Sequence, residues 1–467
     1  MTRPLIGRTI RRLRTERMLS QQALAVRLGI SASYLNLIEH DQRAVTASLL
    51  LKLGSVLGAD LDALSGKAER QAEAALREVM TDPLLGLDPV PGAELQSFVA
   101  TAPAAARAVL ALYRAWRVAQ EDATDIALPS GRRVRLPAEE ARDFFQEHGN
   151  HFPGLEAAAE AIIPDIGHDP ERLVADRLRA GHGVRVRVGP GDTLRRYDPG
   201  TRILDLSEAM RRESRVFRLA FQLALLEARE VLDEAVAAAS PSTPEAGGLI
   251  RLGLCNYAAA ALLMPYAPVL ATAEALRYDV DAIAARFGVS WEQAAHRLST
   301  LQRVGARGIP FFFIRADPAG NIDKRFSAAG FPFARFGGSC PRWVVHTAFS
   351  TPDRLCVEAA ELPDGAAFLC VARVVTGTPA RLDDPPPRHV VAVGCDLDRA
   401  SELAYAAMVN PDRRLGIGLS CRLCDRADCR NRAFPPLQHR LVIDPNQDSA
   451  EPWRFVPDRT SPGRERS

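Results

Sequence analysis

The chain has 467 residues, of which 47% are hydrophobic and 25% charged, as in an ordinary globular protein of several domains. Its formal net charge of +2 excludes a strong overall attraction to nucleic acid or to a membrane, and no apolar run reaches the length of a bilayer span. Met1 leads into an arginine-rich segment and not into a secretion signal. We therefore expect a cytoplasmic protein without membrane contact, whose eight cysteines are thiols or metal ligands.

The first part of the chain predicts a helix-turn-helix. Ser20 is placed to cap a helix over residues 21–28, Gly29 suits a tight turn, and Ser31 is placed to cap a second helix over residues 32–39. Two short helices joined by a glycine turn are typical of this motif.

The same region closely resembles the Xre/Cro-type repressors from residue 3 to about residue 64, which implies a five-helix DNA-binding bundle at residues 1–66. In this motif the second helix enters the major groove, where Asn36 can pair with adenine and Ala32 or Leu37 can contact a thymine methyl group. We expect a homodimer, because the half-sites of a symmetric operator lie about 34 Å apart. The predicted contacts to double-stranded promoter DNA are Gln21, Ser31, Ala32, Ser33, Asn36, Leu37 and Arg43.

Charge supports DNA binding by this head. Residues 1–58 contain nine Lys and Arg against three Asp and Glu, a surplus of six positive charges. Phosphate contacts need such a local field. The alternative is a helical bundle that contacts another protein.

Residues 67–150 are expected to form a helical linker and dimerisation region. Prolines and glycines between residues 81 and 103 predict an irregular connection. Helical patterns follow at residues 104–120 and 138–148.

Residues 151–305 predict an α+β domain. A helical pattern covers residues 169–181, strand patterns follow at residues 184–188 and 203–206, and one long helix is expected from Glu208 to Leu232.

This domain resembles the ImmA/IrrE metallopeptidase-like family, in which a His-Glu-x-x-His zinc motif precedes a Leu-Leu-Met-Pro segment. Residues 262–265 are that later segment here, whereas Phe221, Gln222 and Leu225 stand where the zinc motif should align. Without the histidines there is no zinc-bound hydroxide, and without the glutamate there is no general base. We expect a degenerate zincin-like domain that is not an enzyme.

The spacing of Cys421, Cys424 and Cys429 predicts a soft-metal or redox site within residues 306–445. A four-iron cluster or a tetrahedral zinc ion needs a fourth ligand. Cys395 and Cys340 both lie in glycine-containing turns and are the candidates, and we favour Cys395. The alternative is a reduced loop without metal.

Three segments, at residues 337–343, 393–396 and 418–436, complete a pattern with the head and the middle domain. Together they resemble the short-chain fatty acyl transcriptional regulators over nearly the whole chain. The resemblance implies a bacterial regulator of acetate, propionate, and glyoxylate or methylcitrate metabolism. It also implies a short-chain acyl-CoA effector and an iron–sulfur cluster, for which we predict a 4Fe-4S cluster with zinc as the alternative.

The expected fold is mainly α with α+β parts. It comprises the five-helix bundle, the helical linker, the degenerate zincin-like domain and an α+β cysteine-containing domain. A disordered tail is expected at residues 446–467.

An acyl-CoA site needs arginines for three phosphate groups and a small apolar pocket for the acyl chain. We predict Arg195 and Arg196 as phosphate partners, with Tyr197 and Tyr257 near the adenine or the acyl group. The plain alternative is that these arginines are solvated on a strand face. Two other functions stay open: a redox-sensing regulator without an acyl-CoA ligand, and a peptidase that cleaves a partner repressor.

Overall fold

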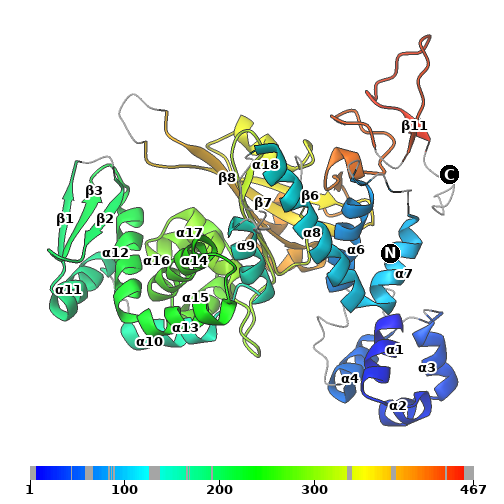
Figure 1. The fold of residues 1–467 in the computed structure, drawn as a ribbon, viewed down its shortest axis with the longest axis horizontal. Helices are drawn as coiled ribbons and strands as arrows, with labels where there is room; N and C mark the ends of the chain where they lie inside the picture. Colours follow the sequence, from blue (N-terminus) through cyan, green and yellow to red (C-terminus); the bar gives the residue numbers. More distant parts are fainter. Residues whose placement is uncertain are drawn as a thin grey trace.

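The protein is elongated, with the N-terminal helices at one end and a small three-stranded sheet at the other (Figure 1). Its fold is mainly α with α+β parts, which confirms the expected class. The computed structural model describes residues 7–456, apart from residues 41, 44, 58–66, 83, 84, 86, 88, 89, 126–136, 165, 166, 168, 191, 192, 334–338, 380–384, 437 and 438.

The head contains the predicted helix-turn-helix. Its described helices are α1 (Gly7–Glu16), α2 (Gln21–Leu28), α3 (Ala32–Glu39) and α4 (Ala47–Leu57). The Ser20 hydroxyl accepts from the Ala23 N–H, and the Ser31 hydroxyl accepts from the Tyr34 N–H, so both predicted caps are confirmed. Gly29 has φ +71°, the left-handed conformation that ends a helix. The fifth expected helix would fall at residues 58–66, outside the described residues.

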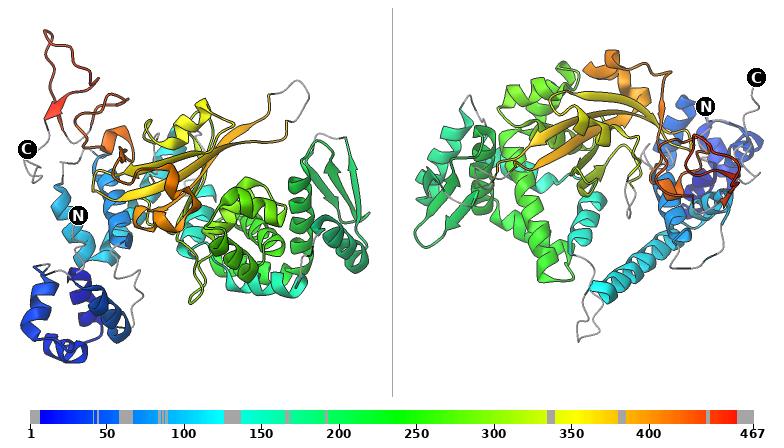
Figure 2. Two further views of the ribbon diagram at one scale, coloured as in Figure 1. Left: turned by 180° about the vertical axis from the view of Figure 1, so that it is seen from behind. Right: turned by 90° about the horizontal axis from the view of Figure 1, so that it is seen from above.

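A three-helix bundle follows the head. It consists of α6 (Lys67–Met80), α7 (Gly92–Thr101) and the long α8 (Pro103–Asp125), which Figure 2 shows running diagonally across the molecule. Leu76, Leu95 and Leu110 form its core. The prediction of an irregular connection between residues 81 and 103 was wrong for α7, because the prolines lie before and after this helix and not inside it.

The middle of the chain folds as helices beside a three-stranded sheet. In this sheet β1 (Arg185–Gly189) runs parallel to β3 (Ile203–Ser207), and β2 (Arg195–Asp198) pairs antiparallel on the other side of β3. The helices are α9 (Pro137–Glu147), α10 (Pro153–Ile162), α11 (Pro170–His182), α12 (Arg212–Glu227), α13 (Arg229–Ala239), α14 (Pro244–Leu263), α15 (Tyr266–Ala275), α16 (Val280–Phe287) and α17 (Trp291–Ser299).

One expected element divides in two. The helix predicted from Glu208 to Leu232 is instead α12 and α13, which meet at Ala228 with φ −97° and ψ 19°. Neither a proline nor a glycine marks this break, and both helices continue an apolar pattern, so no breaker signal is present there.

The C-terminal domain contains a six-stranded sheet with the order β5-β4-β8-β7-β6-β9. Its strands are β4 (Phe312–Ala316), β5 (Ile322–Ser327), β6 (Cys356–Glu361), β7 (Ala367–Thr376), β8 (Arg388–Asp396) and β9 (Leu415–Gly416). The short helix α18 (Val344–Thr347) packs against one face. The 3-10 turns are η1 (Ala348–Ser350), η2 (Leu397–Glu402), η3 (Ala404–Met408) and η4 (Cys421–Leu423).

One hydrophobic core runs through both of these domains. Phe313, Val391 and Cys395 on one face of the sheet belong to the same buried cluster as Leu254 of α14 and Leu298 of α17. The opposite face of the sheet, with Phe312 and Cys370, forms a second cluster. The predicted domain boundary at residues 305 and 306 therefore crosses a continuous core.

A two-stranded hairpin of β10 (Arg440–Leu441) and β11 (Phe455–Val456) projects from the C-terminal end (Figure 1). It includes the first part of the segment predicted as a tail, whereas residues 457–467 lie outside the described residues.

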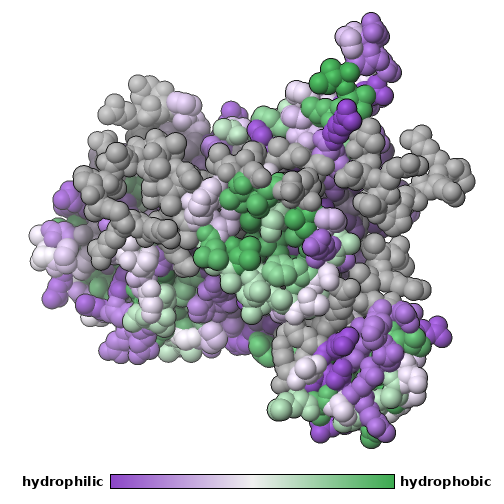
Figure 3. Space-filling view, turned by 45° about the vertical axis from the view of Figure 1, so that its right-hand side comes forward, coloured by the Kyte–Doolittle hydropathy of each residue, from purple (hydrophilic) through white to green (hydrophobic). Residues whose placement is uncertain are grey.

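Apolar surface is gathered at the centre of the face drawn in Figure 3, while the head at its lower right is mostly polar. Among the described helices, α14 has the length and mean hydropathy of a membrane span, as does the bent α7–α8 pair. Of the most apolar window of α14, however, 67% is buried inside the protein, which is typical of a core helix.

Candidate DNA-reading face and cysteine site

The predicted DNA contacts on α3 lie on one exposed side of the head. Ser31, Ala32, Ser33, Asn36 and Leu37 are exposed, while Leu35 and Ile38 of the same helix are buried in the head's core. Arg43 is exposed after α3, and Gln21 is half-buried at the start of α2. The structure therefore brings the predicted residues to a single face.

A hydrogen-bond network beneath this face holds Asn36. Gln21 Nε2 donates to Asn36 Oδ1 at 3.1 Å and to Glu39 Oε2 at 3.0 Å. Because a carboxylate only accepts, Gln21 must present its NH2 group here, and Asn36 its oxygen. The Asn36 NH2 group is then directed to other acceptors, such as the N7 atom of a purine.

Glu39 is itself fixed by Arg14. The Arg14 guanidinium donates to both Glu39 oxygens at 2.6 and 3.0 Å, and Glu39 is 2% exposed. Sequence reasoning did not identify this pair, because the residues are 25 positions apart and no local pattern joins them.

The second site is formed by cysteines of the C-terminal domain. Cys424 and Cys429 are buried and Cys421 is half-buried. Cys340 is also buried, and it interacts electrostatically with Cys421, Cys424 and Cys429. The structure thus brings four thiols into one neighbourhood.

Cys395, which we favoured as a fourth ligand, lies elsewhere. It is on β8 and faces the core shared with α14 and α17, whereas Cys340, Ile417 and Leu419 belong to the cluster on the opposite face. Alternate residues of a strand point to opposite faces of a sheet, so its position on β8 directs Cys395 away from the group.

The chain around the thiols provides hydrogen-bond donors. Burial raises the pKa of Cys340, and the backbone N–H groups of Gly418 and Arg342 oppose this rise. Burial likewise raises the pKa of Cys424, against the N–H of Arg426. Such N–H groups stabilise thiolate ligands.

Arg432 organises the loop from within. Its guanidinium, 3% exposed as a residue, donates to the carbonyl oxygens of Cys421 at 2.6 Å, Cys424 at 2.8 Å and Arg426 at 2.7 Å. Sequence reasoning missed this residue. The only signal was an arginine three positions beyond Cys429, among several others.

The fit of a metal can be tested on this geometry. Among the described residues, no three His, Cys, Asp or Glu side chains lie close enough to hold one ion. Gly418 leaves space beside the thiols, since a Cβ there would lie 2.8 Å from the Cys424 sulfur. A four-iron cluster binds each thiolate through a different iron, so its ligands stand further apart than those of one ion. Four thiolate donors are chemically suited to an iron–sulfur cluster and to zinc.

A third region lies where the zinc motif would align. The Arg195 guanidinium stacks 4.7 Å from the Phe221 ring and donates to Gln222. Burial lowers the pKa of Arg195, and the nearby Arg218 lowers it further. Arg218 itself is half-buried and its pKa is lowered by burial. The Glu292 carboxylate opposes the lowering for Arg218. The pair of arginines is a candidate site for an anion.

The other predicted acyl-CoA residues are not gathered there. Arg196 is exposed and pairs across the strands with Asp205, and Tyr197 is half-buried against the main core. Tyr257 is buried, and its hydroxyl donates to Glu156. The structure brings Arg218 to Arg195, which sequence reasoning did not foresee.

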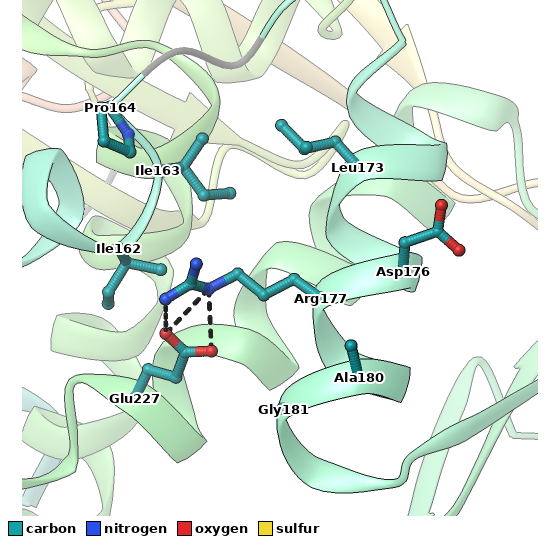
Figure 4. A pocket seen from close by; sticks show the side chains of 9 residues that line it. All are labelled: Ile162, Ile163, Pro164, Leu173, Asp176, Arg177, Ala180, Gly181 and Glu227. Carbon is teal, nitrogen blue, oxygen red and sulfur yellow. Dashed lines mark hydrogen bonds and ion pairs between the residues drawn. The ribbon is translucent and has the colours of Figure 1, made fainter.

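A cavity of about 640 Å³ lies between α10, α11 and the end of α12 (Figure 4). It is lined by Ile162, Ile163 and Leu173, and Arg177 crosses it to bind Glu227 with three hydrogen bonds of 2.7 to 2.9 Å. None of the predicted ligand residues lines this cavity.

Comparison with known proteins places each part in a class. Residues 10–64 match a helix-turn-helix model, residues 179–299 match the IrrE N-terminal-like domain, and residues 300–453 match the short-chain fatty acyl coenzyme A regulator, C-terminal domain. The fold and the head thus define a helix-turn-helix regulator with a peptidase-like middle domain.

Similar proteins cover almost the whole chain. The chain is 38% identical to the HTH-type transcriptional regulator PrpR of Mycobacterium tuberculosis, over 97% of this chain and 96% of the relative. It is 39% identical to RamB of the same species, over 97% and 99%, and 38% identical to the propionyl-CoA carboxylase regulator of Cereibacter sphaeroides, over 96% and 98%. The chain belongs to the short-chain fatty acyl-CoA regulator family.

A solved structure supports the fold. A Mycobacterium tuberculosis transcriptional regulator matches with a TM-score of 0.65 and 40% identity, over 68% of this chain and 99% of that one.

Proposed function

We propose that this protein is a sequence-specific DNA-binding regulator of short-chain fatty acid metabolism, which acts as a homodimer on promoter DNA. The observation that carries the proposal is the exposed face of α3, where Gln21, which also donates to Glu39, fixes the Asn36 side chain in a position to contact a base edge. The family supports it, because similar proteins are named as helix-turn-helix regulators and one as a propionyl-CoA carboxylase regulator.

The test is selection of a binding sequence from random duplexes, followed by binding titrations at several salt concentrations. We expect a symmetric site, an affinity that falls with salt, and a dimer on the duplex. Arg43→Ala should weaken all duplexes alike if this side chain meets a phosphate. Binding that does not distinguish any duplex from another would contradict the proposal.

The middle domain acts as a scaffold and not as a peptidase. Phe221, Gln222 and Leu225 occupy the positions of the zinc ligands and base, and Phe221 carries the Arg195 guanidinium on its ring. Such residues cannot hold a catalytic zinc. Chelator-sensitive cleavage of a partner protein, traced to this chain, would overturn this part of the proposal.

The cysteine site binds a 4Fe-4S cluster through Cys421, Cys424, Cys429 and a fourth cysteine, with zinc as the alternative. Cys340 is the fourth ligand in this proposal, in place of Cys395, because it neighbours the other three thiols. When bound, the cluster would supply a redox-active centre. The residues of this chain hold it: the N–H groups of Gly418 and Arg426 face the sulfurs, and Arg432 fixes the loop.

Anaerobic purification tests this site. The protein should contain iron and sulfide, and Ser at Cys340 or Cys421 should abolish them. The matched controls are Cys395→Ser and Cys356→Ser, which should keep both. Stoichiometric zinc without iron would decide for the structural zinc site, and loss of iron in Cys395→Ser with retention in Cys340→Ser would restore our first choice of ligand.

A short-chain acyl-CoA is the proposed effector, with Arg195 and Arg218 as phosphate partners. An anion between these two half-buried guanidinium groups would relieve their mutual repulsion. Arg196, Tyr197 and Tyr257 stay predicted ligand contacts, and the exposure of Arg196 and the burial of Tyr257 argue for smaller contributions.

Calorimetry with acetyl-, propionyl- and butyryl-CoA tests the effector. Affinity should rise modestly with chain length, because each buried methylene contributes about 0.8 kcal/mol. Arg195→Ala with Arg218→Ala should lose binding, and the exposed Arg211→Ala serves as the control. Absence of binding below millimolar concentrations would leave the alternative, a redox-sensing regulator without an acyl-CoA ligand.

A further inference from the structure

The helix α6 lies between two parts of the molecule. Leu76 and Val79 on one side belong to the core that α6 shares with α7 and α8. On another side, residues spaced by three or four positions face the C-terminal domain across a cavity of about 140 Å³. These are Gln71, Ala74, Ala75 and Glu78, and across the cavity lie Phe331, Phe333 and Leu419.

The bundle to which α6 belongs also touches the DNA-reading head. Helix α1 of the head contacts α7, and α7 packs on α6. In Figure 1 the bundle lies directly above the head. Packed helices therefore connect α6 with the head.

One ion pair joins α6 to the cysteine loop. Arg77 Nη1 lies 3.2 Å from Asp425 Oδ2, and Asp425 directly follows Cys424. The same guanidinium also binds Glu73, one turn earlier in α6, at 3.1 Å. On its other oxygen, Asp425 is 3.0 Å from His439 Nε2. The Asp425 carboxylate thus connects the helix to the loop that carries three of the cysteines.

The contact between α6 and the C-terminal domain leaves room for movement. Ala74 and Ala75 are small, and the cavity beside them is unfilled by side chains. Packed interfaces of this kind move by small sliding steps between discrete arrangements. A directional contact such as an ion pair then decides which arrangement is preferred.

We infer that Arg77 is a positioning residue, which transmits the state of the cysteine loop to the DNA-reading head through α6. The inference rests on the proposed function, in that metal binding by Cys421, Cys424 and Cys429 fixes the loop. Asp425 lies between the second and third of these cysteines, so its carboxylate moves with them. Its pair with Arg77 sets the position of α6 and hence the orientation of the head.

The size of the effect follows from the exposure of the pair. The side chains of Arg77 and Asp425 are 28% and 38% exposed, so solvent partly screens their electrostatic attraction. Such contacts change an equilibrium by up to about fivefold. We therefore expect metal loading to change DNA affinity by about three- to fivefold through this contact.

The experiment uses the full chain, loaded anaerobically or stripped of metal, and the duplex selected by the wild-type protein. DNA affinity is measured by fluorescence anisotropy, and iron and sulfide are measured on the same samples. In Arg77→Gln the loaded and stripped proteins should bind the duplex with about equal affinity, so that their ratio is about one, with the metal content unchanged. Arg77→Lys keeps the charge opposite Asp425 and should keep most of the ratio.

Two controls lie close to the ion pair. Glu73→Gln removes the negative charge of a second partner of Arg77 and leaves the Asp425 contact, so its ratio should be that of the wild type. Arg142→Gln changes an arginine that lines the same cavity but pairs with Glu139, and should also keep the ratio. Asp425→Asn tests the pair from the loop side and should behave as Arg77→Gln does.

Specific outcomes overturn the inference. A wild-type ratio in both Arg77→Gln and Asp425→Asn would show that coupling bypasses this pair. An equal loss in Glu73→Gln or Arg142→Gln would show a general effect on packing. A wild type that binds no metal contradicts the proposed function, whereas a wild type that binds metal and keeps one DNA affinity contradicts only this inference.

Discussion

Replacing Glu156 by Gln should destabilise the middle domain, because it leaves Arg297 buried without a counter-charge. The two side chains are 1% and 0% exposed. Arg297 donates to the Glu156 oxygens at 2.6 and 2.8 Å, and its Nε donates to the Met264 carbonyl at 2.9 Å. These contacts connect α10, the end of α14 and α17 inside the middle domain.

The expected loss is about 3–5 kcal/mol, which is typical when one partner of a buried ion pair is removed. The control is Glu160→Gln, one turn further along α10. Glu160 lies 3.4 Å from Arg303 in a pair that is 47% and 38% exposed, so its loss should be about 0–1 kcal/mol. The double variant Glu156→Gln with Arg297→Met should lose less than Glu156→Gln alone, because no buried charge remains.

Hydrogen exchange of peptides from α14 and α17 measures the stability of the middle domain locally. A local measurement is needed because a chain of several domains does not unfold in one step. Faster exchange in Glu156→Gln than in Glu160→Gln is the expected result. Equal losses of stability in Glu156→Gln and Glu160→Gln would refute the reasoning. A double variant less stable than Glu156→Gln alone would refute it too.

Three further predictions concern other parts of the molecule. Gln21→Ala should reduce discrimination at the base pair read by Asn36 by about 1 kcal/mol, in competition titrations with single-base variants, while the exposed Gln22→Ala should not. Burial lowers the pKa of His296 to about 4, so its neutral form stabilises the fold above pH 6.5. This stability should be lost as the pH falls from 6.5 toward 4, and His296→Gln should flatten the dependence in exchange measured at pH 7 and 5. Arg432→Gln should lower the bound iron, whereas the exposed Arg430→Gln should keep it; equal iron in both would remove Arg432 from the site.

Local patterns carried most of the fold prediction. Ser20 and Ser31 correctly predicted where α2 and α3 begin, because a capping hydroxyl acts within three residues of its own position. The break at Ala228 had no such residue, so one helix was expected instead of two.

For the candidate sites, too, local features could be predicted from the sequence and features that depend on distant partners could not. The spacing of Cys421, Cys424 and Cys429 is local and was visible, whereas the proximity of Cys340 depends on how the sheet positions two distant loops. Arg14, Arg218 and Arg432 matter only through partners that the fold supplies, and nothing in their neighbouring residues distinguishes them from other arginines in an arginine-rich chain.

The continuous core across residues 305 and 306 gives the peptidase-like domain a structural role that does not depend on zinc. Leu254 and Leu298 cover one face of the sheet whose strands include Phe313 and Val391. Deleting the domain would expose that face to water, and a bare sheet face is an aggregation surface. The peptidase-like domain therefore protects the C-terminal domain from aggregation. The interior of the peptidase-like domain is thus also part of the interior of the C-terminal domain.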